Sequence, residues 1–189
     1  MLIAYPGAVD LDGITYDPLP QAEDEADHVA GLYAHKKYLR PHEVTTENLL
    51  QQLPHFSMFH FGGHAETREF SGELIVHGSH GGDTFSASKL SGLDLRGLKL
   101  AILSSCSTGR DRNGLVGAFL NAGTGQVIAS QWDVQSGSTA SLMHSFYDAL
   151  QTEPESANAL RIAWNRFIAS SDYSHPYYWS AFQIFAPVN

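Results

Sequence analysis

Two residues that can act together as a thiol nucleophile and its base follow two separate strand-like segments of the chain. His64 comes shortly after a segment that ends at Phe61, and Cys106 comes shortly after one that ends at Leu103. A neighbouring imidazole that takes the thiol proton, together with free backbone N–H groups, activates a cysteine for nucleophilic attack. The positions therefore permit a histidine–cysteine pair. The alternative is that Cys106 is an ordinary small residue buried at a strand end, where free cysteines are common.

Six short segments have the alternation or the bounded apolar run that is typical of a β-strand. They are 2–5, 57–61, 73–77, 99–103, 126–130 and 181–185. Helical periodicity or helix-ending residues mark four further segments, the last of which has Ser156 as its predicted N-cap. They are 26–33, 115–120, 138–150 and 156–169. Strands that alternate with helices favour a mostly parallel sheet with helices on both faces, which is the α/β class.

Ligands of such sheets bind beyond the carboxyl ends of the strands, so three segments are expected to carry chemistry. These are 62–66, 104–109 and 131–136, and the first two contain His64 and Cys106. The Gly- and Ser-rich segment 77–86 is predicted to be a long surface turn, and the alternative is a mobile cover.

Composition limits the function classes. The 189 residues, 43% of them hydrophobic, are enough for one globular domain that spans 1–189. Eleven Lys and Arg against twenty Asp and Glu give a net charge of −9, and no basic run is present, so nucleic acid is not an expected ligand. Since the single cysteine has no partner for an internal disulfide, a reducing compartment is expected.

The amino-terminal segment lacks the basic region and the long apolar run of a signal peptide. No stretch reaches the roughly 18 apolar residues that a membrane span requires. We therefore expect a soluble, cytoplasmic chain without a membrane partner. Because strand-like residues begin at position 2, the chain is either a domain excised from a larger protein or a naturally minimal one.

Five blocks of the sequence, in this order, together resemble the CHAT domain, a member of the caspase and separase-like clan that is often fused to tetratricopeptide repeats. The blocks are FHFGGH at 59–64, LSSCSTG at 103–109, ASQWDV at 129–134, LM at 142–143 with FY at 146–147, and HPYYWSAF at 175–182. The resemblance covers nearly the whole chain. It implies a caspase-like three-layer sandwich and a cysteine endopeptidase that needs no cofactor.

By this resemblance His64 matches the catalytic histidine and Cys106 the nucleophile. The backbone N–H groups of Ala65 and Cys106 would form the oxyanion hole, with Ala65 standing where glycine is commoner in the family. The resemblance also implies a substrate pocket that includes Ser104, Trp132 and Asp133. Basic residues are the expected substrates at this pocket.

One departure from the family pattern bears on specificity, since Ser136 stands where relatives carry an acid. The expected partners are a protein or peptide substrate and a regulatory partner or a tetratricopeptide-repeat domain. The alternative function, from another class, is a catalytically silent CHAT-type module for protein interaction or signalling.

A zinc site is an alternative role for these side chains, because four histidines and the cysteine are numerous enough to supply ligands. They are His60, His64, His77, His80 and Cys106. The spacing of known zinc motifs is missing, so we expect no metal.

Overall fold

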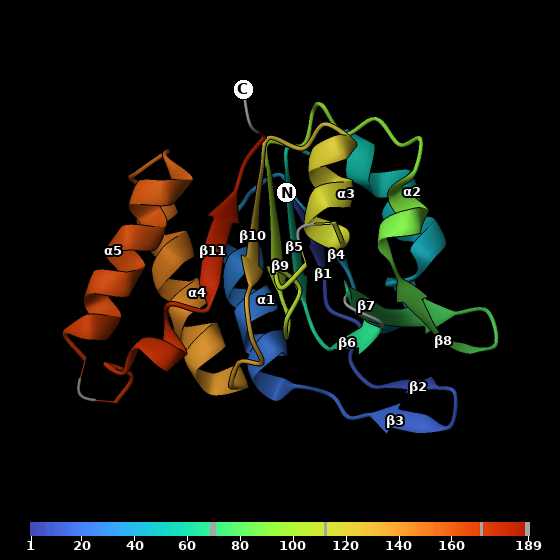
Figure 1. The fold of residues 1–189 in the computed structure, drawn as a ribbon, viewed down its shortest axis with the longest axis horizontal. Coiled ribbons are helices and arrows are strands. Elements are labelled where there is room, and N and C mark those ends of the chain that lie inside the picture. The colour runs from blue at the N-terminus through green and yellow to red at the C-terminus, as the bar shows by residue number, and fades with distance from the viewer. Residues whose placement is uncertain (69–70, 112, 171, 188–189) are drawn as a thin grey trace.

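The computed structural model describes residues 1–68, 71–111, 113–170 and 172–187. Six strands form the central sheet in the order β11-β10-β9-β5-β1-β4 (Figure 1). Their bounds are β1 Leu2–Ala4, β4 Lys37–Leu39, β5 Met58–Gly62, β9 Leu100–Ser104, β10 Gln126–Ser130 and β11 Phe182–Phe185. All neighbouring strands run parallel except β11, which pairs antiparallel with β10. The predicted α/β class with a mostly parallel sheet is therefore confirmed.

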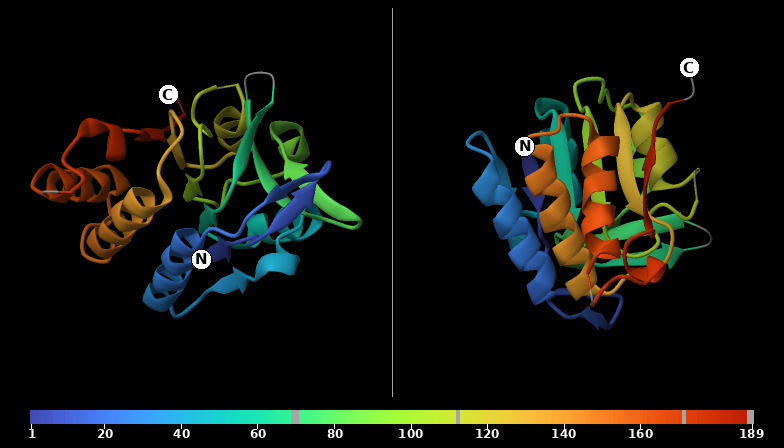
Figure 2. Two further views of the ribbon diagram at one scale, coloured as in Figure 1. Left: turned by 90° about the horizontal axis from the view of Figure 1, so that it is seen from below. Right: turned by 90° about the vertical axis from the view of Figure 1, so that its left-hand side faces the viewer.

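Helices cover both faces of this sheet, as predicted from the sequence. The helices α1, α4 and α5 lie side by side over one face, and α2 and α3 lie over the other (Figures 1 and 2). Their bounds are α1 Pro20–Leu32, α2 Thr46–Gln52, α3 Leu115–Asn121, α4 Ser136–Leu150 and α5 Ser156–Ile168. Four short 3₁₀ turns are η1 Pro41–Glu43, η2 Leu53–His55, η3 Ala87–Leu90 and η4 Pro176–Tyr178. The result is three layers, with the sheet in the middle.

The predicted N-cap of α5 is wrong by one residue. Glu155 is the N-cap, and Ser156 is the first residue of the helix. The Ser156 hydroxyl donates to Oε1 of Gln126 on β10 instead of accepting from the helix. A cross-element hydrogen bond has thus replaced the local cap.

Alternation along the strands divides the core into two apolar layers. On β9, Ala101 and Leu103 pack toward α2 and α3, whereas Leu100 and Ile102 pack toward α1, α4 and α5. This is the period of two that a strand buried on both faces requires. The same alternation on β5 points His60 toward α1 and α4.

Two smaller sheets lie beside the carboxyl end of the central one (Figure 1). Their strands are β2 Val9–Leu11 with β3 Ile14–Tyr16, and β6 Ala65–Arg68 with β7 Ser71–Gly78 and β8 Gly81–Phe85. The predicted long turn at 77–86 is wrong, because most of it lies in β7 and β8. Gly82 is the physical reason: a Cβ there would lie only 2.7 Å from the Val9 side chain, so the glycine permits close backbone packing.

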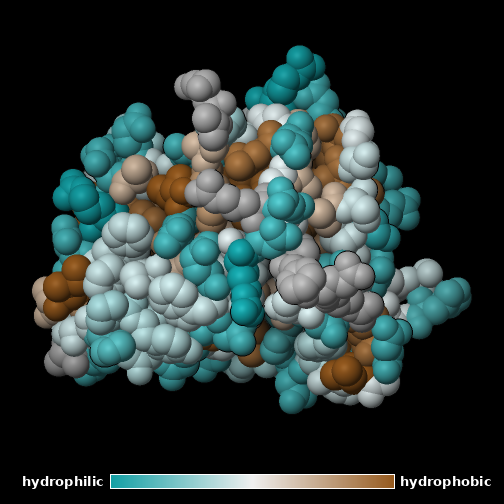
Figure 3. All heavy atoms as spheres, in the orientation of Figure 1, coloured by the Kyte–Doolittle hydropathy of each residue, from teal (hydrophilic) through white to brown (hydrophobic). Residues whose placement is uncertain are grey.

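The surface carries only scattered apolar side chains. Figure 3 shows a face that is mostly hydrophilic or intermediate, with the hydrophobic atoms in separate patches. The large exposed hydrophobic residues of the described ranges, Ile14, Ile168 and Tyr177, belong to three different elements. Within those ranges, no helix combines the length and the apolar character needed to cross a bilayer.

A polar group interrupts the apolar layer between the sheet and α1. Glu25 on α1 is 1% exposed, and its Oε1 lies 3.3 Å from Nε2 of the fully buried His60. Nδ1 of His60 is 3.1 Å from the Tyr147 hydroxyl on α4. Burial raises the pKa of Glu25 to about 8 and lowers the pKa of His60 to about 3. Both side chains are therefore neutral at pH 7.

A prediction for stability follows from these pKa values. Between the ordinary carboxyl pKa of 4.5 and about 8, the unfolded chain has lost the Glu25 proton while the folded protein keeps it. The Glu25 contribution to stability therefore falls as pH rises through this window. In Glu25→Gln that loss is removed, so we expect wild type to lose on the order of 2 kcal/mol more stability than the variant between pH 5 and pH 7.

Urea unfolding of both proteins at the two pH values measures this difference. His60 acts in the opposite direction, because its lowered pKa makes stability rise with pH between about 3 and its ordinary value of 6.5. The variant keeps His60, so the comparison isolates Glu25. Equal pH dependence in the two proteins would show that Glu25 is ionised in the folded state.

Candidate active site

The residues expected to carry chemistry leave the sheet side by side. Strands β5 and β9 are parallel neighbours, and their last residues, Gly62 and Ser104, are register partners. His64 and Cys106 each lie two residues beyond this pair. The Gly63 N–H donates to the Ser104 carbonyl across the gap at 3.4 Å. The strand ends therefore place the imidazole and the thiol in neighbouring segments at the carboxyl edge.

The His64 ring is oriented by the hairpin of β2 and β3. Its Nε2 lies 2.8 Å from the backbone carbonyl oxygen of Asp17, just after β3. Since a carbonyl only accepts, Nε2 must carry the hydrogen, and in the neutral imidazole Nδ1 is left as the basic atom. The ring of Tyr16 packs against His64 with centroids 5.5 Å apart. Pro18 restricts Asp17 to extended conformations, which helps to hold the carbonyl in place.

The Cys106 thiol is partly buried and points toward the segment that follows β10. Its Sγ donates to the carbonyl of Val134 at 3.9 Å. Burial raises the pKa of the Cys106 thiol, and the nearby charge of Asp133 adds to that rise. The thiol is thus protonated at neutral pH, and an attack on a carbonyl requires a base to remove its proton.

Two backbone N–H groups beside these side chains are not used by the fold. Within the described ranges, the Cys106 N–H donates to no protein acceptor. The Ile75 N–H donates to the His64 carbonyl, and in an antiparallel ladder the next pair, Ala65 with Leu74, is then the non-hydrogen-bonded kind. Because β6 is the edge strand of its sheet, the Ala65 N–H points away from β7. Ala65 is in extended conformation, so alanine carries no strain there.

The turn after Cys106 is strained and tied down. Ser107 has φ of 54°, which is uncommon for a residue other than glycine. Its hydroxyl donates to the Asp133 carboxylate at 2.7 Å, and its N–H donates to the Trp132 carbonyl at 3.4 Å. These bonds fix the cysteine turn to the segment after β10.

A small cavity of about 30 Å³ adjoins Cys106. Its lining comes from the ends of β5 and β9, from α1 and from the start of α4: Leu19, Ala22, Glu25, Gly63, Ser104, Ser105, Cys106, Val134, Ser136 and Thr139. Of the three residues expected at the substrate pocket, Ser104 lines this cavity. Trp132 and Asp133 lie outside its lining, and the Trp132 indole donates to the Tyr177 carbonyl at 3.2 Å.

Glu25 is a charged-type residue of the cavity lining that the sequence analysis did not predict. The helical periodicity of α1 places it on the same stripe as Ala22, Ala26 and Val29, all of which are buried. A carboxyl group on the buried stripe of a helix needs a partner, and this was the signal available in the sequence.

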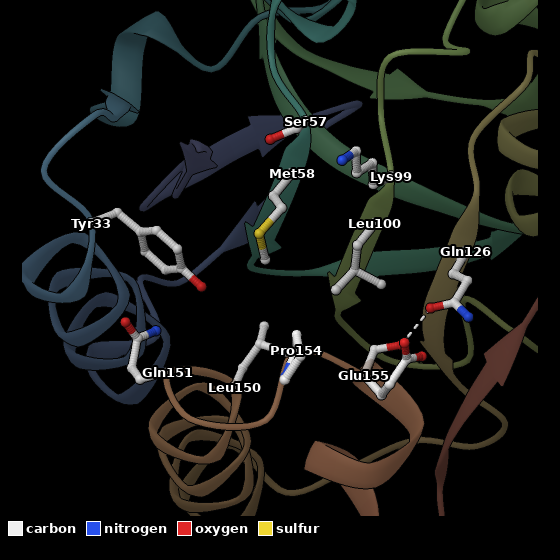
Figure 4. A pocket seen from close by; sticks show the side chains of 11 residues that line it. Tyr33, Ser57, Met58, Lys99, Leu100, Gln126, Leu150, Gln151, Pro154 and Glu155 are labelled. Carbon is white, nitrogen blue, oxygen red and sulfur yellow. Dashed lines mark hydrogen bonds between the residues drawn. The ribbon is translucent and has the colours of Figure 1, made fainter.

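A second cavity, of about 360 Å³, lies at the opposite edge of the sheet (Figure 4). Met58 and Leu100, the first residues of β5 and β9, line it together with Lys99 and Glu155. It contains neither the histidine nor the cysteine of the carboxyl edge. This cavity is thus separate from the residues with nucleophilic chemistry.

The residues weighed as zinc ligands are spread over the molecule. His60 is buried between α1 and α4, whereas Nε2 of His77 lies 2.8 Å from the Pro6 carbonyl. Across 1–68, 71–111, 113–170 and 172–187, no group of three or more His, Cys, Asp or Glu could hold a metal ion.

Comparison with known proteins adds a family and a fold. A family model described as the CHAT domain matches residues 3–187. No curated protein matches the chain. A solved complex of the RgpB pro- and mature domains of Porphyromonas gingivalis matches with a TM-score of 0.65 at 12% identity, covering 98% of this chain and 46% of that one. A crystal structure of the Arg specific cysteine proteinase gingipain R matches with a TM-score of 0.62 at 13% identity, covering 98% and 45%.

At these identities the likeness concerns the fold alone. It is the fold of caspase-like cysteine proteinases, and the expected caspase-like three-layer sandwich is confirmed. The chain spans less than half the length of the solved chains that it matches.

Proposed function

Because the chain belongs to the CHAT domain family, we propose that it is a caspase-like cysteine endopeptidase that cleaves protein substrates with His64 and Cys106. The observation that carries the proposal is the hydrogen bond from His64 Nε2 to the Asp17 carbonyl. It orients the imidazole and leaves Nδ1 unprotonated in the neutral ring. A base that is oriented by a third group, in a segment beside the nucleophile, is the arrangement that nucleophilic catalysis requires.

The proposed reaction proceeds in two steps. As the Cys106 sulfur attacks the scissile carbonyl carbon, His64 Nδ1 takes the thiol proton and then gives it to the leaving amine. The bond to the amine breaks and a thioester remains. In the second step His64 removes a proton from water, and the resulting hydroxide attacks the thioester carbonyl. The carbon–sulfur bond breaks, His64 returns the proton to the Cys106 sulfur, and the carboxylic product leaves. In both steps the N–H groups of Ala65 and Cys106 stabilise the negative charge on the carbonyl oxygen.

Proton transfer in this scheme accompanies the attack. Burial raises the pKa of the Cys106 thiol, so a standing thiolate is not expected at neutral pH. In the substrate-free protein the two side chains bond to other groups, His64 to Asp17 and Cys106 to Val134. Catalytic hydrogen bonds commonly form only when substrate is bound. Control by a regulatory partner or by a fused tetratricopeptide-repeat domain is part of the proposal.

A cysteine-directed peptidyl acyloxymethyl ketone tests the function. We expect it to label Cys106, the single cysteine, in the wild-type chain and to lose at least about 100-fold in labelling rate in His64→Ala. Mass spectrometry of the intact protein gives the rate. His80→Ala changes an exposed histidine in the turn between β7 and β8 and is expected to label like wild type.

The alternative, a catalytically silent interaction module, makes the opposite prediction. In that case the probe fails to react with Cys106, or it reacts equally well with and without His64.

A further inference from the structure

Polar oxygens line the cavity beside Cys106, and the protein leaves two of them unpaired. The hydroxyls of Ser105 and Thr139 are buried, line the cavity and have no hydrogen-bond partner within the described chain. The Glu25 carboxyl also lines it, with Oε1 3.3 Å from Nε2 of His60 and a hydrogen bond to the Ser104 hydroxyl. A buried polar atom without a partner costs free energy and is rare in native proteins. Two such hydroxyls and a buried carboxyl group around one space indicate that the space receives a polar group with several donors.

Charge narrows the choice of that group. The one ion-pair partner of Glu25 in the described ranges is His60, and burial lowers the pKa of His60 to about 3, so it is neutral. The charge of Asp24 on the same helix adds to the rise that burial causes in the Glu25 pKa. The carboxyl group therefore has no cation from the protein, and a positive ligand group would supply one as the carboxyl ionises.

The size of the cavity further limits which ligand group can bind there. A cavity of about 30 Å³ holds roughly two water-sized groups. A lysine ammonium is compact and carries three donors, whereas the arginine guanidinium is a wider planar fork with five. Leu19, Ala22 and Val134 add apolar surface to the lining, against which the methylene stem of a lysine can pack.

We propose that this cavity binds the end of the substrate side chain that precedes the scissile bond, and that Glu25 of α1 makes the protein selective for lysine at that position. The inference rests on the proposed peptidase function. Cys106 lines the cavity, so a side chain that enters it belongs to a residue next to the attacked carbonyl. The carboxyl group that pairs with the substrate lysine is thus Glu25 of the first helix. Asp133, which lies outside the cavity lining, does not supply it.

Peptides that differ only at this residue test the proposal on the full 189-residue chain. The set contains lysine, arginine, glutamate and norleucine, which matches the length of the lysine stem without its charge. We expect kcat/KM for the lysine peptide to exceed that for each of the others by at least about tenfold. In Glu25→Gln we expect kcat/KM for lysine to fall about 10- to 100-fold, with norleucine changed by no more than about twofold.

Asp27→Asn is the matched control, because it removes an exposed carboxylate from the same helix. The ratio of the lysine to the norleucine rate should stay at the wild-type value there. If Glu25→Gln does not fold, Thr139→Val removes another lining oxygen and should lower that ratio several-fold. Circular dichroism establishes the fold of each variant.

The outcomes separate the two proposals. If the ketone probe labels Cys106 but wild type cleaves arginine or norleucine peptides as well as lysine, the pocket assignment is wrong and the peptidase function stands. An equal loss for all four peptides in Glu25→Gln also overturns the assignment, since it indicates a structural role. If neither probe nor peptides react, the peptidase function fails and the pocket assignment fails with it.

Discussion

Cys106→Ala is expected to reduce peptide hydrolysis to background, a loss of at least about 1,000-fold in kcat, while the fold remains. The loss is large because no other group in the cavity lining can form the thioester. The fold should persist, because removing one partly buried sulfur costs on the order of 1 kcal/mol. Fluorogenic peptide cleavage and thermal unfolding of the same preparations measure the two effects.

Cys106→Ser provides the matched comparison, since it keeps the shape of the side chain but replaces the thiol by a weaker nucleophile. It should also be inactive or nearly so. If Cys106→Ala unfolds the protein, Cys106 is a core residue. If it leaves cleavage intact, the nucleophile is elsewhere.

His64→Gln is expected to lower kcat by a factor similar to that of Cys106→Ala. The imidazole supplies both proton transfers. Because burial raises the pKa of the Cys106 thiol and keeps it protonated, the thiol needs this base in order to attack. Since the two residues act as a unit, the double variant should be no slower than either single one. Steady-state rates of the three variants, measured with the same peptide, check this.

His77→Gln is the control for this experiment. Its Nε2 also lies 2.8 Å from a backbone carbonyl, that of Pro6, so the substitution removes the same kind of hydrogen bond outside the site. We expect it to keep peptidase activity. A similar loss in both histidine variants would mean that His64 serves only to hold the fold.

The sequence was most informative where hydrophobic periodicity was strong. The pattern of alternation and bounded apolar runs located five of the six strands of the central sheet within a residue or two, all but β4, and the predicted strand 73–77 lies in β7 of a smaller sheet. Turn residues marked the two segments that contain His64 and Cys106. The short strand β4, with its exposed Lys37, has no such run. The strand β8 was not predicted, because its glycines are typical of a turn. In the structure Gly82 instead allows β8 to pack closely against Val9.

The site itself was only partly predictable. Asp17 acts through its backbone carbonyl, and a carbonyl has no signature in the sequence. Glu25 has a side chain that the helical pattern places on the buried stripe of α1, but the sequence analysis does not include it in the site. Its importance depends on the ends of β9 and α4 coming together around it, which is a tertiary fact.

The group that orients His64 belongs to the main chain, and this affects how the site tolerates change. Any amino acid at position 17 presents a carbonyl oxygen, so substitutions at this position do not remove the hydrogen bond that orients His64. What the arrangement requires is the path of the chain from β3 through Pro18 into α1. Insertions or deletions in that short stretch would move the carbonyl away from the imidazole. The length of this connection, more than the identity of its residues, is therefore what natural variation has to preserve.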